Sequence, residues 1–203
     1  MPLIKYNNQS LSSITALPSA IPTGKLKLIS SQTASNSASI SFTSGLNSTY
    51  KVYKFVFSNL HPADDGIEFE FNMSTDSGSN YNVTKTTTFF AAQHSEDDAT
   101  TALSYNTNTD RAQSTAFQPL TSSTKNNNDT SLSGSLLIFN PSSTTYVKHF
   151  IGVFDSVHSS DRANNAYIAG YGNTTSAVNA IRFQANTGNI DAGTIYLYGI
   201  DNS

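Results

Sequence analysis

Apolar and polar residues alternate with a period of two along much of the chain from Lys25 onward. This is the pattern of β-strands with one buried face. The clearest case is residues 67–73 (IEFEFNM), in which four apolar side chains alternate with two carboxylates and an amide. Turn-forming clusters at residues 62–66 and 76–80 flank it. The segment therefore predicts a half-buried strand between two turns.

Further strands are expected at residues 25–33, 38–43, 50–57, 81–92, 133–141, 146–154, 167–171, 178–185 and 194–200. The nearly continuous apolar run of residues 50–57 indicates a central strand partly covered on both faces. Interrupted alternation in residues 178–185 predicts a bulge or a register change. Residues 95–131 have the weakest pattern, with a loop tip at 125–129 and a helical turn or short strand within 112–120.

Roughly nine or ten strands with few helix candidates predict an all-β fold, an antiparallel sandwich of two sheets. Pairing of the last strand with the first long ones would give it a jelly-roll topology, which limits exposed sheet edges.

Residues 1–24 lack this periodicity and contain Pro2, Pro18 and Pro22. Because a residue before proline is driven to extended conformations, we expect an N-terminal arm over residues 1–24 and a sandwich domain over residues 25–203. The arm carries large apolar side chains that a solvated tail would not need. These are the predicted partner-binding residues: Leu3, Ile4, Tyr6, Leu11, Ile14, Leu17 and Ile21.

The composition favours a neutral, hydrogen-bonding surface. Ser, Thr and Asn make up more than a third of the chain, whereas charged residues are only 12%. The net charge of −3 and the absence of a Lys/Arg run argue against nucleic-acid binding. No run approaches the roughly 20 apolar residues that span a bilayer, and residues 1–6 do not begin a signal peptide. The absence of cysteine excludes disulfides and thiolate chemistry.

Candidate catalytic or metal-binding groups are sparse, and we predict neither an enzyme nor a cofactor. Glu68 and Glu70 lie about 7 Å apart by strand rise, within the range of a glycosidase pair, but alternation alone explains both as outward residues. The acidic clusters 64–66 and 96–98 have no EF-hand spacing. The histidines form no closely spaced pair, so loop roles are favoured over metal binding: His61, His94, His149 and His158.

Sugar binding is the alternative that stays open. Several tyrosines lie near Asn residues in expected loops or at expected strand ends: Tyr81, Tyr105, Tyr167 and Tyr171. Aromatic rings flanked by amides can stack on glycans, but the chain has no Trp.

Several phrases of the sequence together carry a resemblance. They are residues 3–8 (LIKYNN), 16–24 (ALPSAIPTG), 53–63 (YKFVFSNLHPA), 137–145 (LIFNPSSTT), 173–183 (NTTSAVNAIRF) and 187–200 (TGNIDAGTIYLYGI). In these, the chain resembles small virion structural or fibre-like proteins of tailed bacteriophages, many of them marine. The resemblance spans nearly the whole chain and brings no catalytic motif.

The resemblance implies a jelly-roll domain on the exterior of a phage particle, assembled in the bacterial cytoplasm. Together with the residue patterns above, this leaves three classes of function to weigh. The first is capsid decoration (a cement protein) or a head-fibre component, held by the N-terminal arm to the major capsid protein, a fibre protein or other copies in a trimer or another symmetric oligomer. The second is a receptor- or glycan-binding module of a tail fibre. The third is a depolymerase that uses Glu68 and Glu70.

Overall fold

A computed structural model describes residues 26–201, which form twelve β-strands and no helix. The strands are β1 (Leu26–Thr33), β2 (Ile40–Phe42), β3 (Val52–Pro62), β4 (Phe69–Ser74), β5 (Lys85–Ser95), β6 (Thr101–Tyr105), β7 (Gln118–Pro119), β8 (Leu132–Phe139), β9 (Lys148–His158), β10 (Arg162–Gly172), β11 (Ala180–Ala185) and β12 (Ile190–Ile200). Within the described residues there is accordingly no helix that could span a bilayer.

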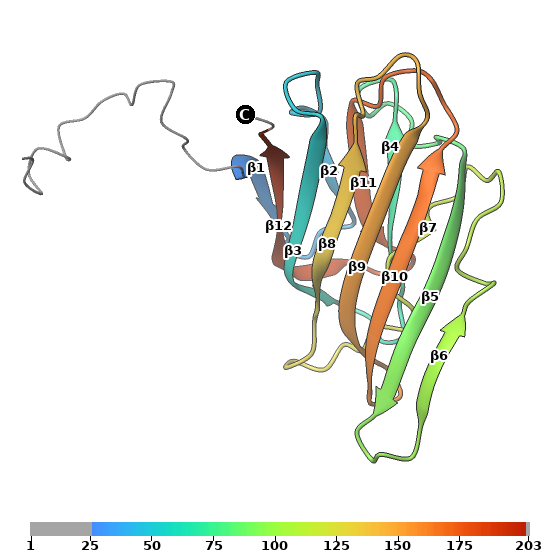
Figure 1. Cartoon of the computed structure of the whole chain (residues 1–203). Helices are drawn as coiled ribbons and strands as arrows, with labels where there is room; N and C mark the ends of the chain where they lie inside the picture. Colours follow the sequence, from blue (N-terminus) through green and yellow to red (C-terminus); the bar gives the residue numbers. More distant parts are fainter. Residues whose placement is uncertain (1–25, 202–203) are drawn as a thin grey trace, which may run out of the picture.

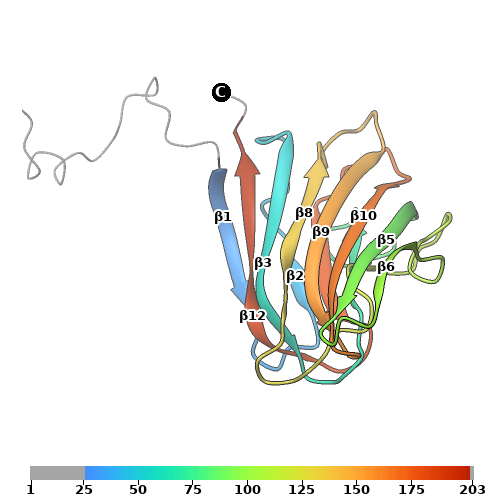
Figure 2. The same cartoon turned by 60° about the horizontal axis from the view of Figure 1, so that its bottom comes forward.

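The strands form two antiparallel sheets that pack face to face (Figures 1 and 2). The large sheet has eight strands in the order β1-β12-β3-β8-β9-β10-β5-β6, and the small sheet has four in the order β2-β11-β4-β7. The predicted all-β sandwich of two antiparallel sheets is therefore confirmed. The last strand, β12, pairs with β1 and β3, as expected. The jelly-roll topology stays a prediction.

Alternation along the strands decides which side chains enter the core. In β9, buried and exposed residues alternate over nine successive positions, with Phe150 and Phe154 inside. Between the sheets, Phe183 of β11 makes edge-to-face contacts with Phe42, Phe55 and Phe57, at ring-centroid distances of 5.0–6.3 Å. Such pairs add to the hydrophobic gain from burying each ring, so this cluster joins the two layers.

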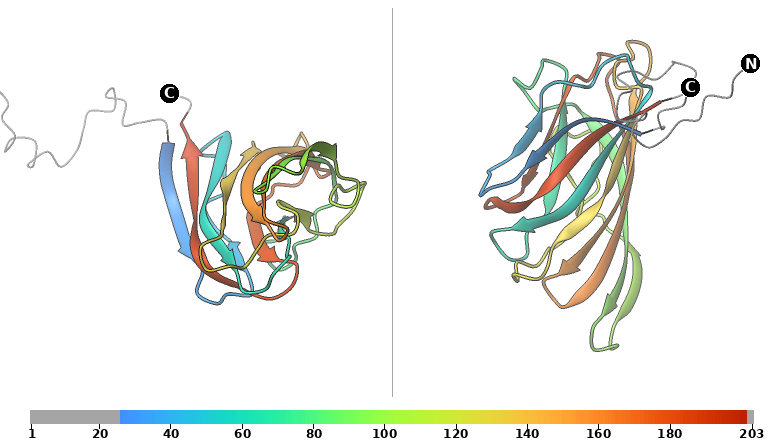
Figure 3. Two further views of the ribbon diagram at one scale, coloured as in Figure 1. Left: turned by 90° about the horizontal axis from the view of Figure 1, so that it is seen from below. Right: turned by 90° about the vertical axis from the view of Figure 1, so that its left-hand side faces the viewer.

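Two sequence-based expectations are wrong in detail. The predicted irregularity in residues 178–185 is absent, because β11 pairs with β2 and β4 in unbroken register. The register shifts lie instead in the β1–β12, β12–β3 and β3–β8 pairs of the large sheet. The weakly patterned region 95–131 contains two strands, β6 and β7, of which β6 is exposed on both faces (Figure 3). A strand without a buried face has no reason to alternate.

The polar side of β4 is also not a solvent-facing surface. Asn72 is fully buried, and its amide donates to the carbonyls of Tyr81 and Thr115 at 2.7 and 2.8 Å. Segments before β5 and before β7 therefore lie over the outer side of the small sheet. The large sheet has no comparable cover among residues 26–201, and Figure 1 looks directly onto its uncovered side.

Candidate functional site

The side of the large sheet that faces away from the small sheet, here called the outer face, collects exposed apolar side chains. In β9, Ile151 and Val153 point outward between the buried phenylalanines, and Ile151 is 49% exposed. Of the exposed large hydrophobic residues in the described chain, only Tyr146 lies elsewhere. The others are Leu26, Leu28, Phe90, Leu103, Tyr105, Ile151, Val153 and Tyr167.

Strand register aligns these residues into continuous rows. One row crosses from β1 to β5 through Leu28, Tyr198, Lys54, Leu137, Ile151, Ala169 and Thr88. The next crosses from β1 to β6 through Ser31, Tyr196, Val56, Ser135, Val153, Tyr167, Phe90 and Tyr105. Lys54 is the only charged residue in these two rows. The middle of the outer face is therefore apolar and almost free of charge.

An aromatic pair stands in the second row. The rings of Phe90 and Tyr167 stack at a centroid distance of 4.9 Å with their planes 5° apart. One π-face of each ring is thus covered by the other ring, and the two rings project from adjacent strands. A sugar needs a free, flat ring face, whereas a protein side chain can also pack against ring edges. The arrangement favours a protein partner over a glycan here.

A shallow hollow of about 240 Å³ opens beside this pair, between β5 and β10. Thr86, Thr88, Ala169 and Tyr171 supply its outward-pointing walls, and Gly170 lies at its base. Small side chains at Ala169 and Gly170 leave the space. The outer face therefore offers a recess in which an aliphatic side chain can be seated. In the next row stands Asp155, where partial burial raises the pKa of the carboxyl.

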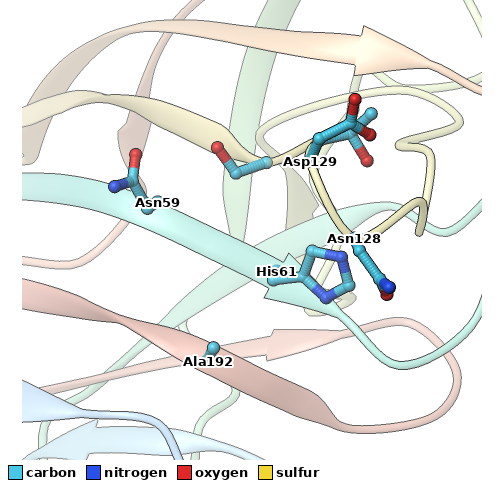
Figure 4. Close-up of a pocket in the computed structure, with 7 residues that line it drawn as sticks. Asn59, His61, Asn128, Asp129 and Ala192 are labelled. Atoms are coloured by element: carbon cyan, nitrogen blue, oxygen red, sulfur yellow. The ribbon is translucent and has the colours of Figure 1, made fainter.

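A separate polar pocket of about 350 Å³ lies where β3 and β12 meet the loop before β8 (Figure 4). His61 stands at one side of it, with Asn128 and Asp129 on the loop across from it. The imidazole Nδ1 lies 2.8 Å from the Asp191 carboxylate and Nε2 lies 2.9 Å from the Asn127 carbonyl. Partial burial opposes the charged ring, but these two acceptors outweigh it and raise the pKa of His61. The pocket can hydrogen-bond a hydroxylated ligand.

Glu68 and Glu70 were expected to face solvent. Both are instead half-buried, because the segment before β7 lies over this side of the small sheet. Burial raises the pKa of both carboxyls, and the guanidinium of Arg111 opposes that shift at each. Glu70 also accepts a hydrogen bond of 2.7 Å from Gln184. Glu70 thus has a hydrogen-bonding partner, and the charge of Arg111 acts on both carboxylates. Below them lies Lys85, fully buried, whose ammonium donates to the Ala116 carbonyl at 2.6 Å.

Two buried lysines were not singled out from the sequence. Lys85 and Lys148 both pair with Gly172, so they flank it on the inner side of the large sheet. Lys148 donates to the carbonyls of Tyr146 and Thr174. Burial lowers the pKa of both lysines, that of Lys85 to about 7. The sequence did hold a signal: each lysine occupies an inward position of an alternating strand.

The remaining histidines and acidic clusters form local contacts. His94 Nε2 lies 2.9 Å from Asp98, and Nδ1 of His158 accepts from the backbone of Ser160. His149 lies on the outer face beside Tyr171. In the acidic clusters, Asp65 accepts from the backbone of Asn126, and Asp97 from Ser95. No group of three or more His, Asp or Glu residues suited to a metal occurs within residues 26–201.

Of the tyrosines considered for sugar binding, Tyr105 and Tyr167 lie on the outer face, and Tyr171 lines its hollow. Tyr81 does not fit, because the Arg182 guanidinium lies 4.1 Å from its ring centroid and its hydroxyl is buried without a hydrogen-bond partner. The predicted arm residues Leu3, Ile4, Tyr6, Leu11, Ile14, Leu17 and Ile21 lie outside the described residues.

Comparisons with families, curated proteins and solved structures gave no match.

Proposed function

We propose that this chain is a non-enzymatic structural protein that assembles with other proteins through the outer face of its large sheet. The observation that carries the proposal is the gathering of the exposed apolar side chains on one uncovered, nearly charge-free face. Contiguous exposed apolar surface on a folded domain is typical of interaction sites. The small sheet has its outer side covered by its own segments, which leaves the large sheet as the contact surface.

The setting we propose is the exterior of a tailed-phage particle, as a capsid decoration protein or a head-fibre component. The resemblance described above supports this setting, and the neutral Ser/Thr/Asn composition is compatible with an exposed position. The partners would be the major capsid protein or a fibre protein, together with further copies of this chain.

Incorporation into particles tests the proposal. Phage encoding the chain with Ile151→Lys and Val153→Lys would be purified by density gradient, and the protein in the particle band quantified. Two charges in the middle of the apolar rows should abolish incorporation while leaving the melting temperature unchanged. Tyr146→Lys is the matched control, because Tyr146 is 70% exposed and lies off the outer face. Absence of the wild-type chain from particles, or incorporation of the double variant, would refute the proposal.

A glycan-binding fibre module is the second candidate, and the polar pocket beside His61 is the observation that favours it. Amide, carboxylate and hydroxyl groups line it, from Asn59, Asn128, Asp129, Thr130 and Ser131. Such groups match sugar hydroxyls. Binding of the purified chain to a glycan array, lost in Asp129→Ala and retained in the Ile151→Lys, Val153→Lys variant, would establish this function in place of the first.

A further inference from the structure

The outer face begins at the point where the chain enters the described fold. Leu26 and Leu28 of β1 pair with Ile200 and Tyr198 and place their side chains on that face, both more than half exposed. Resting on the proposed function, we infer that the outer face of one copy is the docking surface for residues 1–25 of a second copy. The partner at this site is thus another molecule of the same chain.

The chemistry of residues 1–25 matches that of the face. The segment contains the seven large apolar residues named above, and its charged side chains are Lys5 and Lys25. The two central rows of the face contain one charged residue, Lys54. Because neither residues 1–25 nor the two central rows contain an acidic group, docking along those rows buries apolar area without leaving an unpaired carboxylate there. A strongly charged partner would lose its hydration against such a face.

The dimensions also agree. Twenty-five extended residues reach at most about 80 Å, while eight strands spaced about 4.8 Å apart span about 34 Å. The segment is therefore long enough to leave one copy and cross the face of another. Rows of outward residues over about 20 Å of strand give a face of about 700 Å². That is close to the ~800 Å² that each partner contributes to a stable interface.

Strand pairing favours the face of a second copy over the chain's own face. Leu26 pairs with Ile200 at the end of β1, where the described chain begins. For residues 1–25 to bind the face of their own copy, the chain would have to reverse its direction before it enters β1. Docking on another copy needs no such reversal. The hollow beside Phe90 and Tyr167 can accommodate an aliphatic side chain of the docked segment.

Disulfide trapping tests the docking, because the chain has no cysteine of its own. One full-length chain carries Ser10→Cys, Ser13→Cys or Ser19→Cys, and a second, longer-tagged chain carries Thr88→Cys in the recess. Mixed and oxidised, the two should form a covalent heterodimer of distinct size, since bridging requires Cα atoms within about 7 Å. Ser79→Cys, exposed in the turn that follows β4 of the small sheet, is the matched control. We expect the heterodimer with Thr88→Cys well above the Ser79→Cys level for at least one arm position.

Sedimentation supplies an independent measurement. The full chain should sediment as a multiple of 21.8 kDa, and deletion of residues 1–25 or Ile151→Lys should reduce it to the single-chain mass, with Tyr146→Lys unchanged. A single-chain mass for the full-length protein at high concentration overturns the inference. A further variant carries both cysteines in one chain. A disulfide that forms within this chain, with none between the two single-cysteine chains, also overturns the inference. Either result leaves the proposed function standing if Ile151→Lys, Val153→Lys still abolishes incorporation into particles. Conversely, incorporation of the Ile151→Lys, Val153→Lys variant into particles would refute the proposed function but not the docking.

Discussion

Lys85 lets the energetics of the core be tested directly. Its side chain is fully buried, its ammonium donates to one carbonyl, and no carboxylate lies within ion-pair distance of it among the ion pairs of the described chain. Burial, helped by the nearby Arg111 guanidinium and opposed by Glu70, lowers the pKa of Lys85 from 10.5 to about 7. The perturbation is Lys85→Met, which keeps an unbranched side chain and removes the charge.

The sign follows from proton binding. Between about pH 7 and pH 10.5 the unfolded chain holds a proton on Lys85 that the folded chain has released, so the stability of the wild type rises with pH in that window. Below pH 7 the full cost of the buried charge is present. One pKa unit corresponds to ~1.4 kcal/mol, so that cost is about 5 kcal/mol at pH 6 and about 2 kcal/mol at pH 9.

Lys85→Met removes this pH-dependent cost. Its free energy of unfolding should therefore exceed that of the wild type by about 3 kcal/mol more at pH 6 than at pH 9. The loss of the hydrogen bond to Ala116 is the same at both pH values and cancels in the comparison. Urea denaturation followed by fluorescence at the two pH values measures the difference. Lys51→Met, at an exposed position, controls for net charge. Equal differences at pH 6 and pH 9 would refute a buried, largely neutral Lys85.

Three further outcomes are expected. Gly193→Ala should destabilise the fold by more than Gly66→Ala, although both glycines have positive φ. A Cβ on Gly193 would meet a backbone oxygen at 2.3 Å, whereas one on Gly66 would meet only the Ser123 hydroxyl oxygen at 3.7 Å, so equal denaturation midpoints would contradict this. Phe183→Ala should cost about 3–5 kcal/mol in urea denaturation, since its ring joins the two sheets, and a loss below about 1 kcal/mol would show that the cluster repacks. Asp191→Asn should lower the pKa of His61, as measured by NMR titration, and an unchanged pKa would exclude the ion pair. Because the pKa of His61 is raised in the folded chain, the stability that this pair adds is present below pH 6.5 and is lost as the pH rises through the folded value.

Much of the fold could be predicted because strand periodicity is local. The run 67–73 alternates cleanly, and β4 lies there with Phe69, Phe71 and Met73 in the core. The run 50–57 was expected to form a central strand partly covered on both faces. β3 is an interior strand of the large sheet, and over this run it is buried on its inner side and half-buried on its outer side. β6 could not be found in this way, since both of its faces are exposed and nothing selects an alternating pattern.

The candidate site was largely hidden from the sequence. Tyr105, Tyr167 and Tyr171 were singled out for sugars, but their common position on one face depends on β5, β6 and β10 being neighbours. Ile151 and Val153 read as ordinary core residues, because an apolar side chain in a strand carries no mark of which layer it faces.

The sequence by itself determined most of the strands, the sandwich class and the neutral polar composition, because these depend on side-chain type and on neighbours one or two residues away. Only the tertiary structure decided which of two apolar stripes is buried. The eight-stranded sheet packs against a single four-stranded sheet, which can bury only one of its two sides. The second stripe, aligned into rows by pairings between distant segments, is left on the surface as the place where we propose that other chains bind.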